Sequence, residues 1–382
     1  MYDGLPDFDV TFITYSAEVD CRNIKDLLKD SQHVRVRNST IFPSATSEFF
    51  LCMRSMLSKI MPVPPVNRLN RNDVEHALEK SDVVNCLEIN SLDSQQCAEL
   101  ALNLRLPLVV TVYETRHHAY LNYIPPYSRN AKYVLRHANS HAITDRAKQY
   151  LLHLGVPDEK IDVIHVGIDT KKFAPSKKRN DGRRILFVGR LTAEKGLPYL
   201  VQAFMLLHRE RPDTELWIVG GLSPEGGPTI PDRVDRLSYL REAGKKYPIR
   251  MLGSIHRTSM PEIYRQCDIF CLPSNDNIQF GMKIWDEQLG LALIEAMACG
   301  LPIVSTDCGA IPEVIGKGNL ISKQRDVKDL YVNLKKMVDD DTLRDQLSQI
   351  NRKRVETYFN IEIQKEKLNK FYKRICEDFS DI

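Results

Sequence analysis

The chain has no long run of apolar residues. No window in its 382 residues approaches the roughly 18 uninterrupted apolar residues that a membrane-spanning helix requires. Residues 1–9 also lack the basic and apolar regions that mark a signal peptide. The sequence therefore predicts a cytoplasmic protein.

Neither a large charge of one sign nor a regular spacing of cysteines is found. The formal net charge is +3 with 27% charged residues, so the overall balance gives no reason to expect nucleic acid as a partner. The nine cysteines form no CxxC pattern, which favours a reducing compartment over a disulfide framework or a zinc site. An apolar content of 43% is typical of a globular protein, and a chain of this length predicts about two domains.

Buried strands alternate with helices in the first half. Strands are predicted over residues 9–15, 34–37, 81–90, 106–113, 138–145 and 160–169, and helices over 23–29, 97–103 and 147–154. Such alternation is typical of a parallel sheet, whose ligands bind beyond the carboxyl ends of the strands. The loop of residues 114–120, which follows Tyr113, is therefore well placed for function.

Two segments of this half allow two interpretations each. The predicted helix 49–61 has a broad aromatic and methionine-rich stripe with basic edges, which suits either core packing or contact with a membrane or a lipid-linked acceptor. The basic stretch 171–184 suits either a solvated linker between domains or a surface attracted to anionic lipid.

The second half repeats the alternation. Strands are predicted over residues 184–191, 215–220, 250–255, 268–274 and 303–307, and helices over 196–207, 260–267, 327–338, 343–358 and 361–379. The turn at Gly220 and Gly221 lets a ligand approach the backbone. Asp339, Asp340 and Asp341 are expected to form a solvated cluster at a helix end, not a metal site.

Two glutamates frame the start of an apolar helix. Good helix formers run from Leu291 to residue 299, and Pro302 ends the segment. On one continuous helix Glu287 and Glu295 would be about 12 Å apart along the axis and roughly 80° apart around it. If the helix instead begins near Gly290, Glu287 lies in a loop and free backbone N–H groups point between the two acids. That arrangement suits an elongated ligand with phosphates at its centre and hydroxyl groups at both ends; the alternative is a core helix with one satisfied glutamate.

The run Glu287-Gln-Leu-Gly-Leu-Ala-Leu-Ile-Glu295-Ala-Met-Ala-Cys-Gly-Leu-Pro, with Pro273-Ser274 before it and Gly309-Ala-Ile-Pro-Glu313 after it, resembles the E-x7-E signature of the retaining glycosyltransferases of family 4. Gly189-Arg-Leu and Glu194-Lys-Gly are similar to a second motif of that family. The resemblance implies the GT-B fold, with two facing Rossmann-like doubly wound domains. It implies an acceptor domain over residues 1–175, a nucleotide-sugar donor domain over 176–358, and a C-terminal helix over 359–382 that returns to the first domain.

The resemblance also implies roles for individual residues. A nucleotide-diphosphate sugar is the expected donor, with no cofactor and no metal. Arg190 and Lys195 are expected to bind the diphosphate and stabilise the charge that develops there, because fixed cations act most strongly on the transition state. Glu295 is expected to bind the ribose hydroxyls and Glu287 the donor sugar; a covalent nucleophile is the alternative role for Glu287. The remaining donor-side residues implied are Gly189, Ser254, Ile255, Leu289, Gly290 and Leu291.

The first half departs from the family pattern in two places. The loop after the first strand lacks the Gly-Gly-x-Glu motif that many members carry. Tyr113 stands where the family usually has a histidine facing the donor sugar, and His117 and His118 follow it. These three residues are the predicted sugar-side or acceptor-side candidates.

The resemblance thus implies a metal-independent retaining glycosyltransferase that moves a hexose-type sugar to a hydroxyl of a glycan or lipid-linked acceptor. A peripheral contact with the inner membrane face is kept as an option for such an acceptor. Two alternatives are a non-catalytic subunit that binds nucleotide sugar and an enzyme related to the glycan phosphorylases, although no lysine context for pyridoxal is identified.

Overall fold

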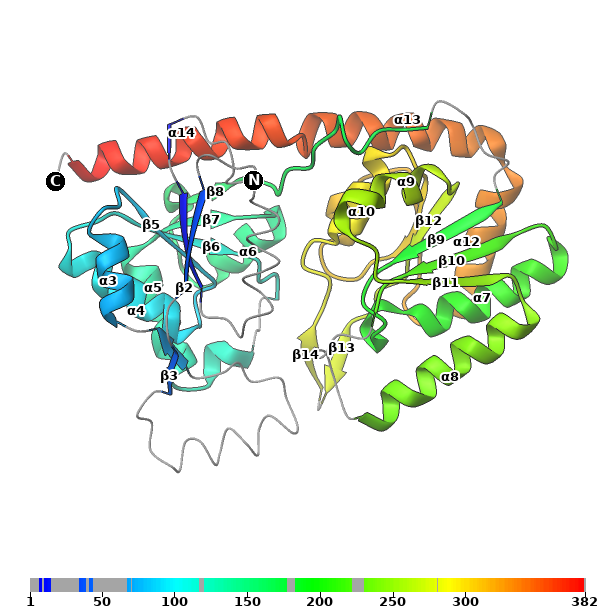
Figure 1. Ribbon diagram of the computed structural model, residues 1–382, viewed down its shortest axis with the longest axis horizontal. Coiled ribbons are helices and arrows are strands. Elements are labelled where there is room, and N and C mark those ends of the chain that lie inside the picture. Colours follow the sequence, from blue (N-terminus) through cyan, green and yellow to red (C-terminus); the bar gives the residue numbers. More distant parts are fainter. Residues whose placement is uncertain are drawn as a thin grey trace. The chain divides into compact units, whose positions relative to one another are not determined.

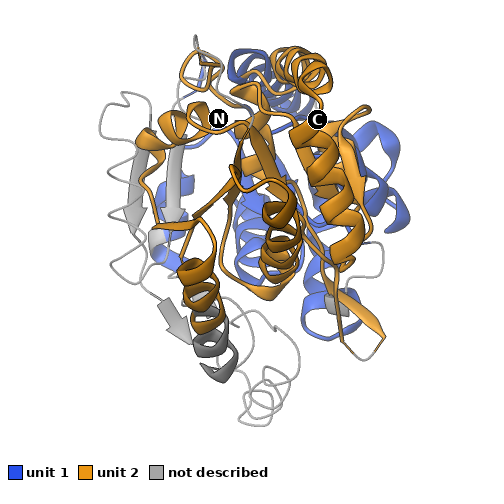
Figure 2. Ribbon diagram, turned by 90° about the vertical axis from the view of Figure 1, so that its right-hand side faces the viewer, with its two compact units in different colours: residues 1–167, 361–382 blue, residues 168–360 orange. Residues whose placement is uncertain are grey.

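The chain divides into two compact units, coloured separately in Figure 2. Unit 1 comprises residues 1–167 and 361–382, and unit 2 comprises residues 168–360. The computed structural model describes residues 7–8, 10–14, 34–38, 41–43, 67–69, 71–116, 120–176, 183–221, 230–279 and 281–380. The predicted helices 23–29 and 49–61, together with His117 and His118, lie outside the described residues.

Unit 2 is built on a parallel sheet of six strands, in the order β11-β10-β9-β12-β15-β16. The strands are β9 (Arg184–Val188), β10 (Glu215–Val219), β11 (Ile249–Gly253), β12 (Ile269–Leu272), β15 (Ile303–Thr306) and β16 (Leu320–Ser322). Numbered along the chain, this is the 3-2-1-4-5-6 order of a Rossmann sheet. Every residue of β12 and β15 is buried, as expected for central strands covered on both faces.

The helices of unit 2 connect these strands or, as with the last two, follow them (Figure 1). They are α7 (Leu197–Glu210), α8 (Ile230–Lys246), α9 (Met260–Arg265), α10 (Leu291–Ala298), α11 (Ile311–Ile315), α12 (Val327–Asp339) and α13 (Asp341–Tyr358). A short antiparallel hairpin, β13 (Asn277–Gln279) and β14 (Met282–Trp285), stands between β12 and α10.

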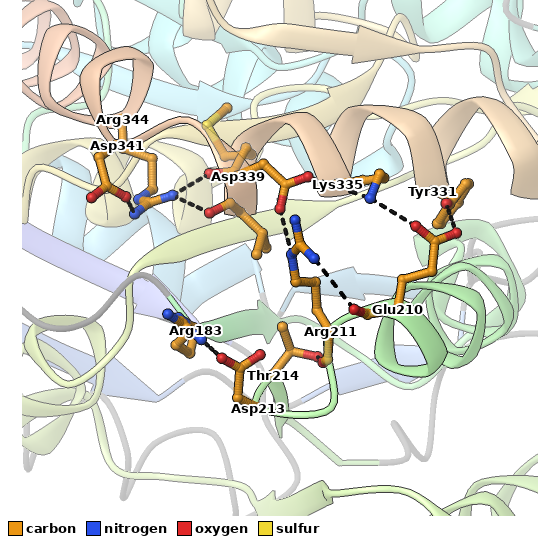
Figure 3. Close-up of polar contacts among 12 residues, drawn as sticks. Arg183, Glu210, Arg211, Asp213, Thr214, Tyr331, Lys335, Asp339, Asp341 and Arg344 are labelled. Carbon is orange, nitrogen blue, oxygen red and sulfur yellow. Dashed lines mark hydrogen bonds and ion pairs between the residues drawn. The ribbon is translucent and has the colours of Figure 1, made fainter.

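The three consecutive aspartates Asp339, Asp340 and Asp341 lie where α12 ends and α13 begins, and Figure 3 shows the contacts of Asp339 and Asp341. Asp339 accepts from Arg211, which follows α7, at 2.6 Å. The side chain of Asp340 caps α13 by accepting from the N–H of Leu343 at 2.8 Å, while Asp341 pairs with Arg344. The cluster lies at the junction of the two helices and is exposed there, as the sequence predicts for its position. Within the described residues, no group of three or more His, Cys, Asp or Glu side chains could hold a metal ion.

Unit 1 contains a parallel sheet of four strands in chain order, β5 (Val84–Leu87), β6 (Leu108–Val112), β7 (Asn139–Ala142) and β8 (Ile161–Val163). Its helices are α3 (Arg71–Leu78), α4 (Leu92–Asn103), α5 (Tyr127–His137) and α6 (Asp145–His153). Strands β1 (Val10–Thr14) and β2 (Val34–Asn38) form a parallel pair, and β3 (Ile41–Pro43) and β4 (Asn67–Leu69) an antiparallel one.

The last helix, α14 (Ile361–Ser380), belongs to unit 1 although it follows unit 2 in the chain. Leu368, Phe371, Tyr372 and Ile375 pack in one buried cluster with Val109 of β6 and with Ile164. The Tyr372 hydroxyl also accepts from the Asn85 amide at 2.9 Å. The C-terminal helix therefore returns to the first unit, as the fold prediction requires.

The units divide at residues 167/168 and 360/361, whereas the sequence predicts divisions at 175/176 and 358/359. The first difference has a packing reason. Phe173 is 2% exposed and contacts the Tyr264 ring of unit 2, and Arg352 donates to the Phe173 carbonyl at 2.8 Å. Residues 168–176 are thus part of unit 2. Among the described helices, none combines the length and apolar character needed to cross a membrane.

Candidate functional site

The order of the unit 2 sheet reverses between β9 and β12, and the loop that follows β9 carries three of the predicted donor residues, Gly189, Arg190 and Lys195. A sheet of this kind binds its ligands in the crevice at such a reversal, beyond the carboxyl ends of the strands. Residues 189–196 follow β9, and residues 273–276 follow β12. The Asn275 N–H donates to the Glu194 carbonyl at 2.7 Å, so the two loops touch at this edge.

A cavity of about 420 Å³ opens beyond the carboxyl ends of β9, β10 and β11. Five predicted residues line it: Gly189, Arg190, Ser254, Ile255 and Glu295. The sequence prediction missed two further lining side chains, because Arg257 and Met260 lie in a turn and a short helix with no motif to mark them. Val188 and Val219 also line the cavity, as do Gly220 and Gly221, the turn at which the sequence predicts that a ligand can approach the backbone.

Glu295 is held at the cavity by a residue of α9 and by one in the short 3-10 helix that precedes α9. Its side chain lies on α10, and the residue is 9% exposed. The Tyr264 hydroxyl donates to Glu295 Oε2 at 2.9 Å, and Arg257 lies 3.9 Å from Oε1. Burial raises the pKa of Glu295, while the hydrogen bond from Tyr264 and the charge of Arg257 oppose the rise. The carboxylate is thus fixed at the wall of the cavity.

The helix α10 begins after Gly290, so the two acids do not share one helix. Gly290 is the N-cap residue with φ of 72°, in the left-handed region that favours glycine. The break predicted from the sequence is confirmed. The first N–H groups of α10, including that of Leu291, have no partner within the helix. Leu291 is 42% exposed, whereas Leu289 is buried.

Glu287 forms a buried ion pair with Lys195 in the loop before α10. Lys195 Nζ lies 2.7 Å from Glu287 Oε2, and the Ser274 hydroxyl donates to the same oxygen at 2.8 Å. The exposed fractions of the Lys195 and Glu287 side chains are 13% and 8%. Two charges so well shielded from water each require a partner of opposite charge, and here each side chain is the partner of the other.

The backbone of Glu287 is fixed by close contact with the loop after β15. The Ala310 N–H donates to the Glu287 carbonyl at 2.7 Å. Gly309 has φ of 56°, and a Cβ atom there would lie 2.1 Å from the Glu287 carbonyl oxygen. Only glycine lets the two backbones approach in this way, so the motif around Gly309 acts by positioning Glu287.

Arg190 lies at the exposed side of the site. Its guanidinium is 3.5 Å from Glu194, and its side chain is 46% exposed. Lys195 and Glu287 do not line the cavity itself. The predicted residues therefore form two neighbouring groups: the cavity with Glu295, and the buried pair of Lys195 and Glu287 in the loops that precede α7 and α10.

Unit 1 carries a polar cluster at the carboxyl ends of β5 and β6. Tyr113, the predicted candidate, directly follows β6, and its N–H donates to Glu88 Oε1 at 2.9 Å. Glu114 is 6% exposed and accepts from the N–H groups of Thr115 and Arg116, both at 2.9 Å, as well as from the Arg116 guanidinium. Glu88 was missed because it follows a strand without any recognisable motif. Burial, together with the nearby Glu114 carboxylate, raises the pKa of Glu88 to about 7.

Residues 168–354 match the model of the family "Glycosyl transferases group 1". The matched residues make up nearly all of unit 2, which is thus similar to this family. Because the matched range runs through β9 to β16 and most of α13, it contains the cavity, the Lys195–Glu287 pair and the start of α10.

Among similar proteins is the D-inositol 3-phosphate glycosyltransferase of Corynebacterium jeikeium (strain K411), 32% identical over 201 residues. The match covers 48% of this chain and 45% of that protein. The enzyme of the same name from Paenarthrobacter aurescens (strain TC1) is 28% identical over 183 residues, which cover 45% of this chain and 41% of that protein. The matched part thus spans less than half of these relatives' own length.

The solved structures extend the likeness to nearly the whole chain. Anabaena Alr3699/HepE in complex with UDP and glucose has a TM-score of 0.69 at 16% identity, covering 96% of this chain and 99% of that one. The sucrose-phosphate synthase of Thermosynechococcus elongatus has a TM-score of 0.65 at 15% identity, covering 96% and 98%. The predicted GT-B class, with two Rossmann-like units, is confirmed.

The raised pKa of Glu88 predicts a pH-dependent stability. Between the ordinary glutamate pKa of 4.5 and the folded value of about 7, the folded chain keeps a proton that the unfolded chain has lost. Stability contributed by the protonated group is present below pH 4.5 and is lost as the pH rises through 7. The free energy of unfolding of Glu88→Gln minus that of wild type should therefore increase by on the order of 2 kcal/mol from pH 5 to pH 8.

Urea unfolding of both proteins at the two pH values measures this difference, in which the titration of all other groups largely cancels. Glu99→Gln, a substitution on α4 away from the cluster, is the control and should show no such change with pH. A Glu88→Gln effect that is the same at pH 5 and pH 8 would contradict the prediction.

Proposed function

We propose that the chain is a retaining glycosyltransferase that moves a hexose-type sugar from a nucleoside-diphosphate sugar to a hydroxyl group of a glycan or lipid-linked acceptor. The observation that carries the proposal is the placement of the two acids. Glu295 lies at a cavity, Glu287 is paired with Lys195, and the N-terminus of α10 begins between them in the chain.

The donor would lie across this arrangement with its nucleoside in the cavity. Ser254 and Ile255 would contact the base, and Glu295 would accept hydrogen bonds from the ribose hydroxyls. The diphosphate would meet the first N–H groups of α10, at Gly290 and Leu291, where the helix dipole also favours negative charge. Gly189 would let the phosphate approach the loop, and buried Leu289 would support the turn. The UDP in the Anabaena structure makes UDP-glucose the first donor to test.

The transfer breaks the bond between the anomeric carbon and the diphosphate oxygen and forms a bond from that carbon to the acceptor oxygen. Arg190 and Lys195 would stabilise the negative charge that accumulates on the departing diphosphate. The acceptor hydroxyl would attack from the face that the diphosphate leaves and pass its proton to a phosphate oxygen, so the anomeric configuration is retained. This route asks for no catalytic metal.

Glu287 would bind hydroxyl groups of the donor sugar. One of its oxygens is held by Lys195 and Ser274, which fixes the carboxylate in the loop and orients the other oxygen. A carboxylate tied to an ammonium in this way is a poor nucleophile, which favours a binding role over a covalent one.

The acceptor would bind at the carboxyl ends of the unit 1 strands, where Tyr113 lies and where His117 and His118 follow. The cluster of Glu88, Glu114 and Arg116 supports this assignment, because its carboxylates and guanidinium suit a hydroxyl-rich ligand. The names of the curated relatives make D-inositol 3-phosphate one acceptor to test beside glycans and lipid-linked sugars.

Donor binding is tested by calorimetry with UDP, GDP and ADP. One nucleotide should bind selectively, and Glu295→Ala should weaken that binding about 10- to 100-fold, since hydrogen bonds to a charged group are lost. Glu295→Gln keeps an acceptor for the buried Tyr264 hydroxyl and should lose less. Glu242→Ala, on an exposed part of α8, is the matched control and should bind like wild type. Equal affinity of wild type and both Glu295 variants would rule out the proposed ribose contact.

Turnover and stereochemistry are tested by proton NMR with the α-linked sugar nucleotide of the selected base. An axial donor linkage should give an axially linked product, which appears as a small anomeric coupling in the first spectra recorded. A product of inverted configuration would refute the retaining mechanism. Donor binding without turnover on any acceptor class would instead favour a non-catalytic binding subunit.

A further inference from the structure

The hairpin β13–β14 contacts the proposed phosphate site through one aromatic side chain. The hairpin lies between Ser274 and Glu287, and Trp285 is the last residue of β14. Lys195 Nζ lies 5.0 Å from the centre of the Trp285 ring, within the range of a cation–π contact. The same ammonium is 2.7 Å from Glu287. A carboxylate and an aromatic face thus hold Lys195 together.

The two partners affect the charge at the site differently. Glu287 cancels the charge of Lys195, whereas an indole face attracts the ammonium without adding negative charge. A second carboxylate in place of Trp285 would leave the group net negative and repel a phosphate. An ammonium also has three N–H donors, so one carboxylate contact leaves others for an arriving anion. Trp285 can therefore fix the position of Lys195 and keep it attractive to phosphate.

The base of the hairpin is firmly attached to unit 2. Lys283 pairs with Asp276 at 2.6 Å and lies 3.9 Å from Asp286, which is 1% exposed. Residue Asp276 in turn donates its N–H to Gln324, in the loop after β16, at 2.7 Å. Trp285 pairs with Asn277 across the hairpin. The indole therefore lies on a part of the hairpin that these contacts fix in position. Ile278 and Met282, further along the hairpin, are 53% and 41% exposed.

We propose that Trp285 is a positioning residue that holds the Lys195 ammonium in place for the diphosphate, so that the base of the hairpin sets the affinity of the phosphate site. The proposal rests on the proposed function, because it takes Lys195 as a ligand of the diphosphate. It assigns the segment between Ser274 and Glu287 a part in donor binding, in addition to its packing.

The test measures by calorimetry the binding of UDP and of UMP, which lacks the second phosphate. If the nucleotide panel selects another base, the diphosphate and monophosphate of that base replace UDP and UMP. Lys195→Gln should reduce the preference for UDP over UMP. Trp285→Leu should weaken UDP binding roughly 2- to 30-fold, the range of a cation–π contact, and leave UMP binding unchanged. The double variant Lys195→Gln/Trp285→Leu should bind UDP no more weakly than Lys195→Gln alone, because the indole acts through the lysine. Ile278→Ala, elsewhere on the hairpin, should bind both nucleotides like wild type.

The outcomes separate the inference from the function on which it rests. If Lys195→Gln leaves the preference for UDP unchanged, both the diphosphate role of Lys195 and the inference fail. If Lys195→Gln reduces the preference for UDP but Trp285→Leu leaves that preference unchanged, the inference about Trp285 is overturned and the proposed function stands. Equal weakening of UDP and UMP in Trp285→Leu would show a general structural role and also overturn it. Should Trp285→Leu fold poorly, Trp285→Phe keeps a ring face and should give a smaller loss in the same direction, again only for UDP.

Discussion

The ion pair between Lys195 and Glu287 is the interaction on which the site depends. Both side chains are almost fully removed from water, and a buried charge that loses its partner is strongly destabilising. The pair joins the loop that follows β9 to the segment between β12 and α10, and β9 and β12 are the adjacent strands at which the strand order reverses. The topology brings the charges together, and their attraction then fixes the loops.

The two acids of the predicted signature have different surroundings, and the difference matches their proposed tasks. Glu295 lies at the cavity wall with a tyrosine hydroxyl on one oxygen and an arginine near the other. Glu287 is bound to an ammonium and a serine hydroxyl in a loop whose backbone rests against Gly309. The N-terminus of α10 starts between them because Gly290 prevents the helix from extending back to Glu287. A single glycine thus separates the proposed ribose contact from the proposed sugar contact.

The sequence predicted the fold well where burial leaves a clear pattern. The central strands β9, β10, β12 and β15 are short apolar runs, and the break before α10 follows from Gly290. The Lys195–Glu287 contact could not be read from spacing, since the residues are 92 positions apart and meet only through the strand order. Arg257 and Met260 carry no motif, and the three- and four-residue strands of the hairpin are too short to show periodicity. The division near residue 168 was missed because Phe173, which is buried in unit 2, lies within a basic stretch whose composition is typical of a solvated linker.

The central claim is that unit 2 binds a nucleoside diphosphate across the start of α10, and a crystal structure of the chain with UDP, or with the diphosphate chosen by binding, tests it most directly. The account predicts the ribose within hydrogen-bond distance of Glu295, and the terminal phosphate near Lys195 and the first N–H groups of α10. A nucleotide bound elsewhere, or one bound here in the reverse direction with its ribose beside Glu287, would contradict it.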